Sequence, residues 1–359
     1  MKNNFIYSEH CSFFLEDEPF RFIGANMYEL AHVDSATTEL MIEDAAREGF
    51  KVIRFWAFEP TSKNKLKEIC DIVNEYKIKI IPVLADTWGF LQNYRIEGDW
   101  YREGYKKNYI KYVSDIVGSF KEQPEILLWE LINEPSTESF EDIYNFTKDA
   151  SEKIKSIDSN HLLSLGTIGG IGDKFGGFFS RFNSGNFETL YSIKSLDTVS
   201  IHDYSFSSTV FERLDIFQRL KGNYKSSELY KSIADAVNFF PGLIDNATLK
   251  KFDKTYDFPL TIRKIWKTYN SKNISIAKRL KKTVYIGEIG FKKNLNEFRK
   301  IVLENELKRY FKEGVSGILL WSFESQGRSL DGHDYGFGIE DGFGETIKNI
   351  LISETHKES

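Results

Sequence analysis

Eight short apolar runs recur along this chain of 359 residues, and most of them end in a cluster of polar or aromatic residues. Near-continuous apolar runs of this length are typical of strands buried on both faces, as in parallel sheets. The stretches between most runs have apolar residues three and four positions apart, which predicts amphipathic helices. The runs begin at Phe20, Lys51, Lys79, Glu125, His161, Asp197, Thr283 and Ser316, and the predicted helices span residues 37–49, 63–76, 102–120, 140–157, 260–281, 295–314 and 344–353.

Strands that alternate with helices predict an α/β fold, here a single (β/α)8 TIM barrel over residues 1–359. A doubly wound open sheet is the alternative. It is expected to have a glycine-rich turn after its first strand, and the sequence contains no Gly-x-Gly-x-x-Gly pattern. The interval between the sixth and seventh runs is too long for one helix. The excess, residues 206–258, predicts a helical insertion at the active-site end of the barrel that could form a lid.

Composition excludes several classes of protein. The net charge is −5, so the chain lacks the basic field that binds a phosphate backbone, and we expect no nucleic-acid partner. No apolar run approaches the roughly 20 residues that span a bilayer, so we expect no membrane segment. The first residues do not resemble a signal peptide and there are only 2 cysteines, which together favour a cytoplasmic location. Aromatic residues reach 15%, and the surplus is expected to line a binding site.

Polar side chains gather at the carboxyl ends of the predicted strands, where a (β/α)8 barrel carries its active site. Glu134 follows the fourth strand and Glu288 ends the seventh, so the two lie on opposed sides of the barrel. Glycoside hydrolysis needs two carboxyl groups that flank the scissile bond. Aromatic rings at the same rim suit the stacking of a sugar. The other residues expected there are Arg54, Trp56, Asp86, Trp88, Glu130, Asn133, His202, Asp203, Tyr204 and Trp321.

Each glutamate also has a purely structural interpretation. Glu134 could cap the loop that follows it, and Glu288 could form a buried ion pair with Arg54. The presence of both glutamates, together with Asn133 and Tyr204, favours a sugar-cleaving site over this interpretation. The sequence has none of the common motifs for a metal, a nucleotide or a hydrolytic serine, so we predict no cofactor and no metal.

Four motifs, in chain order, resemble those of family 5 glycoside hydrolases. They are WELINEP at 129–135, IHDY at 201–204, YIGEIGF at 285–291 and LLWSF at 319–323. The stretches FRFIGANMYEL at 20–30 and KVIRFWAF at 51–58 most resemble the β-mannanase branch of that family. The resemblance covers nearly the whole chain and implies a retaining (β/α)8 enzyme.

The resemblance also implies roles for single residues. Glu134 matches the general acid/base and Glu288 matches the nucleophile. Asn133 matches the residue that binds the sugar 2-hydroxyl, and Arg54 and Tyr204 match the pair that keeps the nucleophile ionised and oriented.

The remaining matches concern the surroundings of the two glutamates. His202 matches a histidine near the acid/base, and Trp321 matches the platform beneath the reacting sugar. Trp56 and Trp88 are expected to contact the substrate. The segment LADTWGF departs from the family pattern, because many members have His or Asn where this chain has Asp86.

These observations predict an enzyme that cleaves β-1,4-mannosidic bonds in mannan or manno-oligosaccharides by double displacement. Two alternatives remain: a β-glucanase or another β-glycosidase with the same machinery, and a sugar-binding barrel without turnover. The presence of both glutamates favours an enzyme. A lid over residues 206–258 would favour short manno-oligosaccharides over polymeric mannan.

Overall fold

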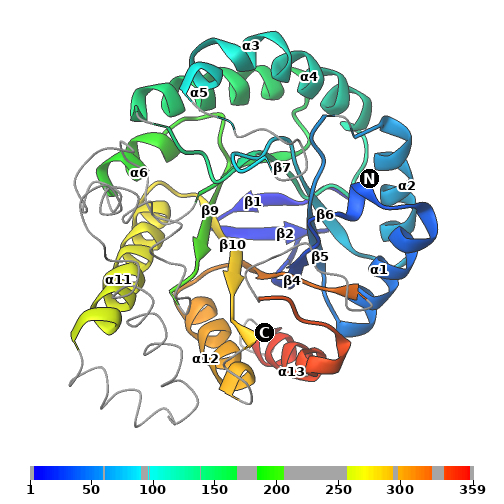
Figure 1. Ribbon diagram of the computed structural model, residues 1–359, viewed down its shortest axis with the longest axis vertical. Helices are drawn as coiled ribbons and strands as arrows, with labels where there is room; N and C mark the ends of the chain where they lie inside the picture. Colours follow the sequence, from blue (N-terminus) through cyan, green and yellow to red (C-terminus); the bar gives the residue numbers. More distant parts are fainter. Residues whose placement is uncertain are drawn as a thin grey trace, which may run out of the picture.

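The computed structural model describes residues 4–59, 61–89, 96, 98–137, 139–167, 184–205, 257–293, 298–325 and 335–355. Eight parallel strands form a nearly closed barrel in the order β8-β7-β6-β5-β4-β11-β10-β9, and helices surround it (Figure 1). The predicted (β/α)8 fold is therefore confirmed. The strands are β4 (Phe22–Asn26), β5 (Val52–Trp56), β6 (Lys79–Val83), β7 (Leu128–Asn133), β8 (Leu162–Gly166), β9 (Thr198–Asp203), β10 (Thr283–Gly290) and β11 (Gly317–Trp321).

Backbone hydrogen bonds connect the two ends of this strand order. The Asp197 N–H donates to the carbonyl oxygen of Leu163 at 3.0 Å, and the His202 N–H donates to that of Thr167 at 2.9 Å. β8 and β9 thus lie side by side, and the barrel interior is enclosed by strands all round. Side chains that point inward from any strand can therefore meet at the barrel axis.

The helices lie close to their predicted positions, and α5 has the predicted bounds. Short α6 was not predicted, because its eight residues include Gly185 and show little periodicity. The predicted helix 102–120 is interrupted: π-helical η2 (Trp100–Gly104) precedes two α-helical segments, and Trp100 packs on Phe146 of α5. The α-helices are α1 (Ser35–Glu48), α2 (Lys63–Glu75), α3 (Tyr105–Lys107), α4 (Tyr109–Phe120), α5 (Phe140–Ile157), α6 (Ser184–Tyr191), α11 (Asp257–Arg279), α12 (Phe298–Lys312) and α13 (Phe343–Thr355).

The predicted insertion, residues 206–258, lies outside the described residues as far as position 256, and α11 begins at Asp257. The proposed lid and the division of the chain into domains therefore stay predictions. Within the described part of the chain, no helix combines the length and the apolar character that crossing a bilayer requires.

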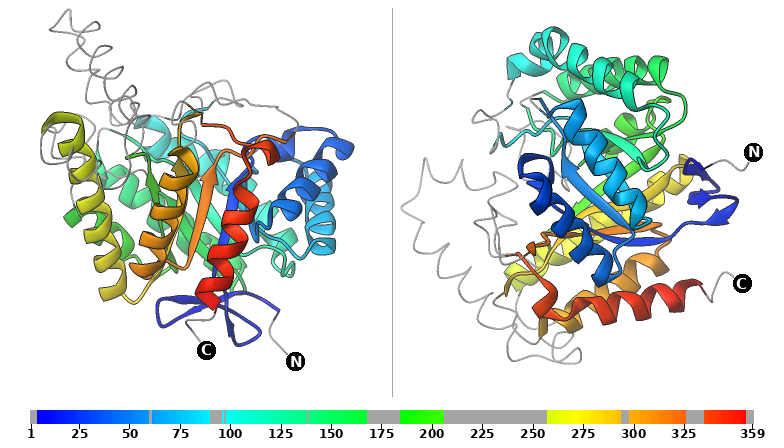
Figure 2. Two further views of the ribbon diagram at one scale, coloured as in Figure 1. Left: turned by 90° about the horizontal axis from the view of Figure 1, so that it is seen from below. Right: turned by 90° about the vertical axis from the view of Figure 1, so that its right-hand side faces the viewer.

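A small antiparallel sheet that the sequence did not predict closes the bottom of the barrel. It consists of β1 (Tyr7–Glu9), β2 (Ser12–Leu15) and β3 (Glu18–Pro19), and it lies at the same end as both chain termini (Figure 2). Phe13 of β2 is 1% exposed, and its ring centroid lies 6.0 Å from that of Phe22 and 6.5 Å from that of Tyr285. The sheet therefore fills the end of the barrel opposite to the polar residues at the carboxyl ends of the strands.

This arrangement predicts the effect of removing the Phe13 ring. Phe13→Ala should lower the free energy of unfolding by about 3–5 kcal/mol, because a buried aromatic ring leaves a cavity behind. Phe14→Ala is the matched control, since Phe14 lies on the opposite face of β2, is half-buried and stacks on Tyr7. Urea unfolding measures both variants. Equal losses in the two variants would contradict the role of β2 as a plug.

Candidate active site

Two register shifts bring extra polar side chains into the barrel. In a regular strand, residues three positions apart point to opposite faces. The pairing of β7 with β8 shifts between Glu130 and Asn133, and the pairing of β10 with β9 shifts between Ile286 and Glu288. Glu130 and Asn133 consequently both reach Arg54. Such bulges commonly redirect side chains next to active sites.

Arg54 of β5 is completely buried at the centre of these side chains. Its Nη1 donates to Oε1 of Glu288 at 2.8 Å, and its Nη2 donates to Oε1 of Glu130 at 2.5 Å. Nη1 also donates to Oδ1 of Asn26 at 2.8 Å, and Nη2 donates to Oδ1 of Asn133 at 2.7 Å. Burial lowers the pKa of Arg54, but the two carboxylates raise it further, so the net shift is upward and the guanidinium stays charged.

The space around Arg54 is full, which explains two glycines. A β-carbon on Gly166 would lie 2.4 Å from Oε1 of Glu130. A β-carbon on Gly287 would lie 2.3 Å from Oγ of Ser200 and 2.8 Å from Nε2 of His202. Both positions therefore require glycine, because backbone and polar side chains approach there more closely than any other residue permits.

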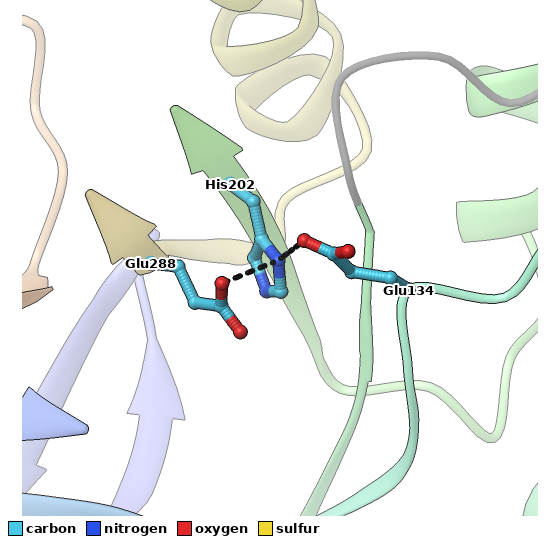
Figure 3. Close-up of side chains that lie close together, drawn as sticks. All are labelled: Glu134, His202 and Glu288. Atoms are coloured by element: carbon cyan, nitrogen blue, oxygen red, sulfur yellow. Dashed lines mark hydrogen bonds and ion pairs between the residues drawn. The ribbon is translucent and has the colours of Figure 1, made fainter. Parts of the chain in front are cut away.

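Glu134, His202 and Glu288 form a compact cluster beside this network (Figure 3). A ring nitrogen of His202 and one oxygen of each carboxyl group all lie within 4.8 Å of one another. His202 Nδ1 lies 2.9 Å from Oε1 of Glu134 and 3.6 Å from Oε2 of Glu288. Glu134 directly follows β7 and Glu288 lies in β10, and their carboxyl groups face each other across the imidazole.

Each glutamate has further hydrogen bonds that fix its orientation. Oε2 of Glu134 accepts the indole N–H of Trp88 at 2.5 Å. Glu134 has a φ of 48°, a left-handed conformation that is uncommon for a residue other than glycine and that occurs often at functional sites. The hydroxyl of Tyr204 donates to Oε2 of Glu288. Both oxygens of Glu288 are therefore engaged, one by Arg54 and one by Tyr204.

The aromatic residues of the rim differ in their exposure. Trp88 and Trp321 are partly exposed, so each has surface available to a ligand. Trp56 has no exposed surface; its ring lies 4.5 Å below the Arg54 guanidinium and 5.5 Å from that of Trp321. The Trp56 indole therefore supports Arg54 and Trp321, and its expected contact with substrate stays a prediction.

Asp86, which follows β6, is also buried in this region. Its Oδ1 accepts from Nδ2 of Asn133 at 3.0 Å and from the backbone N–H of Trp88 at 3.4 Å, and its Oδ2 accepts from the N–H of Gly89 at 3.2 Å. Burial raises the pKa of Asp86 to about 6, and the nearby charge of Glu134 adds to the increase. Hydrogen bonds from Asn133 and Trp88 act in the opposite direction.

The structure thus brings together Glu134, Glu288, Arg54, Asn133, His202 and Tyr204 as the sequence motifs predicted. The ion pair between Arg54 and Glu288, which the purely structural interpretation predicted, is present as well. It lies beside Glu134. Glu130, which was expected at the end of its strand without an assigned role, belongs to the network as well. Two members were missed: Asn26 and Tyr285, whose hydroxyl donates to Oε2 of Glu130 at 2.7 Å.

Among the residues that the structure describes, the group that could hold a metal ion consists of Glu134, His202 and Glu288. The positive charge of Arg54, 2.8 Å from Glu288, opposes a cation at this position. Two carboxyl groups on either side of an imidazole, at the carboxyl ends of the barrel strands, are instead suited to proton transfer and to attack on a substrate held between them.

Comparison with known proteins identifies the class of protein that carries this site. The model of the family described as "Cellulase (glycosyl hydrolase family 5)" matches residues 15–327. The chain therefore belongs to glycosyl hydrolase family 5. It is a glycosidase, and its substrate is a carbohydrate.

Several relatives have names that agree with this family. Mannan endo-1,4-beta-mannosidase 5 of Solanum lycopersicum is 23% identical over 98% of this chain and 88% of its own length. Mannan endo-1,4-beta-mannosidase 4 of the same plant is 26% identical, but the match spans 56% of this chain and 63% of that relative. Among solved structures, the endo-1,4-beta-mannanase from Rhizomucor miehei has a TM-score of 0.69 and 18% identity over 98% of this chain and 99% of its own.

The raised pKa of Asp86 predicts how its replacement affects stability. The pKa in the folded chain is about 6, against an ordinary value of 3.8, so the folded state holds this proton more tightly and stability falls as the pH rises from 3.8 to 6. The resulting penalty at pH 7 is about 3 kcal/mol. The variant Asp86→Asn has no carboxyl group at this position, so this penalty is absent from it. Urea unfolding should therefore show that the variant gains stability relative to the parent between pH 4 and pH 7, and a difference independent of pH would contradict the prediction.

Proposed function

We propose that this protein hydrolyses β-1,4-mannosidic bonds with retention of configuration, by double displacement on Glu288. The observation that carries the proposal is the pair of opposed carboxyl groups, Glu134 and Glu288, with oxygens within 4.8 Å of each other. Retaining glycosidases hold the two groups about 5–5.5 Å apart, whereas inverting enzymes need about 6.5–9.5 Å to admit a water molecule. The short separation supports retention.

In the first step, Glu288 attacks the anomeric carbon while Glu134 donates its proton to the glycosidic oxygen. The bond to the leaving alcohol breaks, and an ester forms between the sugar and Glu288. Arg54 and Tyr204 both donate to Glu288, and these two hydrogen bonds orient its carboxyl group toward the sugar. The second Nδ2 hydrogen of Asn133 would bind the sugar 2-hydroxyl.

In the second step, Glu134 takes a proton from a water molecule that attacks the anomeric carbon and releases Glu288. Each half-reaction inverts the configuration, so the product keeps the anomeric form of the substrate. The His202 imidazole, 2.9 Å from Glu134, is in position to stabilise both protonation states of that residue in turn. Trp321 would pack beneath the sugar.

The choice of mannan over other β-glycans rests on the relatives. The two plant relatives reported above are named mannan endo-1,4-beta-mannosidases, and the match to one of them spans 98% of this chain. A β-1,4-glucan is the second candidate, because the matching family model is described as "Cellulase". The two substrates differ at the sugar 2-hydroxyl, which Asn133 would contact.

A direct test is a time course by proton NMR with manno-oligosaccharides and cello-oligosaccharides of equal length. We expect the manno-oligosaccharides to be cleaved faster, with the β-anomer of the product appearing first and the α-anomer only after mutarotation. Faster cleavage of cello-oligosaccharides would favour the second candidate. Initial release of the α-anomer would reject double displacement, and binding without any cleavage would indicate a sugar-binding barrel.

The proposed roles of the two glutamates predict different defects. Glu288→Ala should abolish turnover of all substrates, since no glycosyl-enzyme can form. Glu134→Ala should lose about 100- to 10,000-fold on natural glycosides, the range that general acid catalysis contributes, but much less on aryl glycosides whose leaving groups depart without a proton. Added azide should restore activity to Glu134→Ala and yield a β-glycosyl azide. If the β-glycosyl azide and the leaving-group dependence both arise with Glu288→Ala instead, the two roles are reversed.

A further inference from the structure

Asp86 accepts hydrogen bonds from three N–H groups of residues that flank the two carboxyl groups of the site, and its electrostatics include a further one from the Trp56 side chain. Its partners are Nδ2 of Asn133 and the backbone N–H groups of Trp88 and Gly89. An ionised aspartate has two acceptor oxygens and no donor, so it satisfies all three at once. An asparagine at this position would have to turn its own NH2 group toward one of these donors. The environment is therefore built for a carboxylate, although burial disfavours one.

The first consequence concerns the orientation of Asn133. A side-chain amide can lie in two orientations, related by exchange of its oxygen and nitrogen. Arg54 can only donate and an ionised Asp86 can only accept, and they contact opposite ends of this amide, at 2.7 Å and 3.0 Å. The pair fixes the amide with Oδ1 toward Arg54 and Nδ2 toward Asp86. One Nδ2 hydrogen then remains for a substrate hydroxyl.

The second consequence concerns Trp88. Asp86 holds the backbone of the two residues that follow Thr87, and Gly89 has a φ of 67°, so the chain turns sharply at this point. The turn places the Trp88 indole N–H 2.5 Å from Oε2 of Glu134. One side chain thus sets the position of both Asn133 and the hydrogen-bond donor of Glu134.

We propose that Asp86 is a positioning residue for the acid/base Glu134 and for the sugar-binding amide of Asn133. The proposal rests on the function proposed above and goes beyond it, because it assigns a role to the position at which the sequence departs from the family pattern. Asp86 itself does not contact the reacting atoms. It acts through Trp88 on Glu134 and directly on Asn133.

The test compares Asp86→Asn, Asp86→Ala and the control Thr87→Val on a series of aryl β-mannosides with leaving groups of increasing pKa. Misplacement of Glu134 should matter most where the leaving group needs a proton. We expect kcat/KM of both Asp86 variants to fall about 10- to 100-fold on the poorest leaving groups and far less on the best. Thr87→Val is matched because it alters the neighbouring buried residue, whose hydroxyl bonds to that of Tyr101 rather than to Asp86, Trp88 or Asn133, and it should leave the series unchanged. Equal losses across the series, or none with Asp86→Ala, would overturn the proposal.

A second measurement does not depend on turnover. The indole N–H of Trp88 should give a downfield NMR signal, assigned by its disappearance in Trp88→Phe, because it donates to a carboxylate. In both Asp86 variants this signal should move upfield, and in Thr87→Val it should stay in place. An unmoved signal in Asp86→Ala would overturn the proposal. If the parent protein cleaves no glycoside of the series or of the oligosaccharide panel, the proposed function fails, and the indole signal still decides the role of Asp86.

Discussion

The buried guanidinium of Arg54 is the interaction on which the rest of the site depends. It lies between two buried carboxylates, Glu130 and Glu288, and its remaining donors go to the amides of Asn26 and Asn133. These partners come from β4, β7 and β10, so they meet only because the sheet closes into a barrel. Removal of one partner from such a group leaves an uncompensated charge, which is far more costly than the loss of an exposed ion pair. The network therefore ties the chemistry of the site to the closure of the fold.

From Arg54 the polar contacts continue round the site and return to their starting point. Arg54 contacts Asn133, Asn133 contacts Asp86, and Asp86 holds the turn that carries Trp88. Trp88 donates to Glu134, His202 lies between Glu134 and Glu288, and Glu288 returns to Arg54. In such a ring no side chain can rotate without the loss of a neighbour's hydrogen bond. The acid/base and the nucleophile are therefore positioned by the same set of contacts, from two directions.

The sequence predicted the barrel and most of the site because both depend on short-range pattern: buried strands read as apolar runs, and polar motifs follow them directly. It did not predict the register shifts in β7 and β10, which depend on how neighbouring strands pair. Regular alternation would place Tyr285 and Glu288 on opposite faces, so the link from Tyr285 through Glu130 to Arg54 could not be inferred. Trp56, which was expected to contact the substrate, packs inside the barrel against Arg54 and Trp321.

The balance of charge in the site bears on the proposed chemistry. Several buried carboxyl groups lie in or around this ring of contacts, and they outnumber the buried guanidinium of Arg54. They belong to Glu130, Glu134, Glu288 and Asp86. The raised pKa of Asp86 is one consequence, since burial and the neighbouring Glu134 both favour its neutral form. An excess of acceptors over cations is unfavourable for an empty site, but it is complementary to an oxocarbenium-like transition state, in which positive charge develops at the anomeric carbon. Arg54 therefore suits a role in holding the carboxylates in place without neutralising all of them.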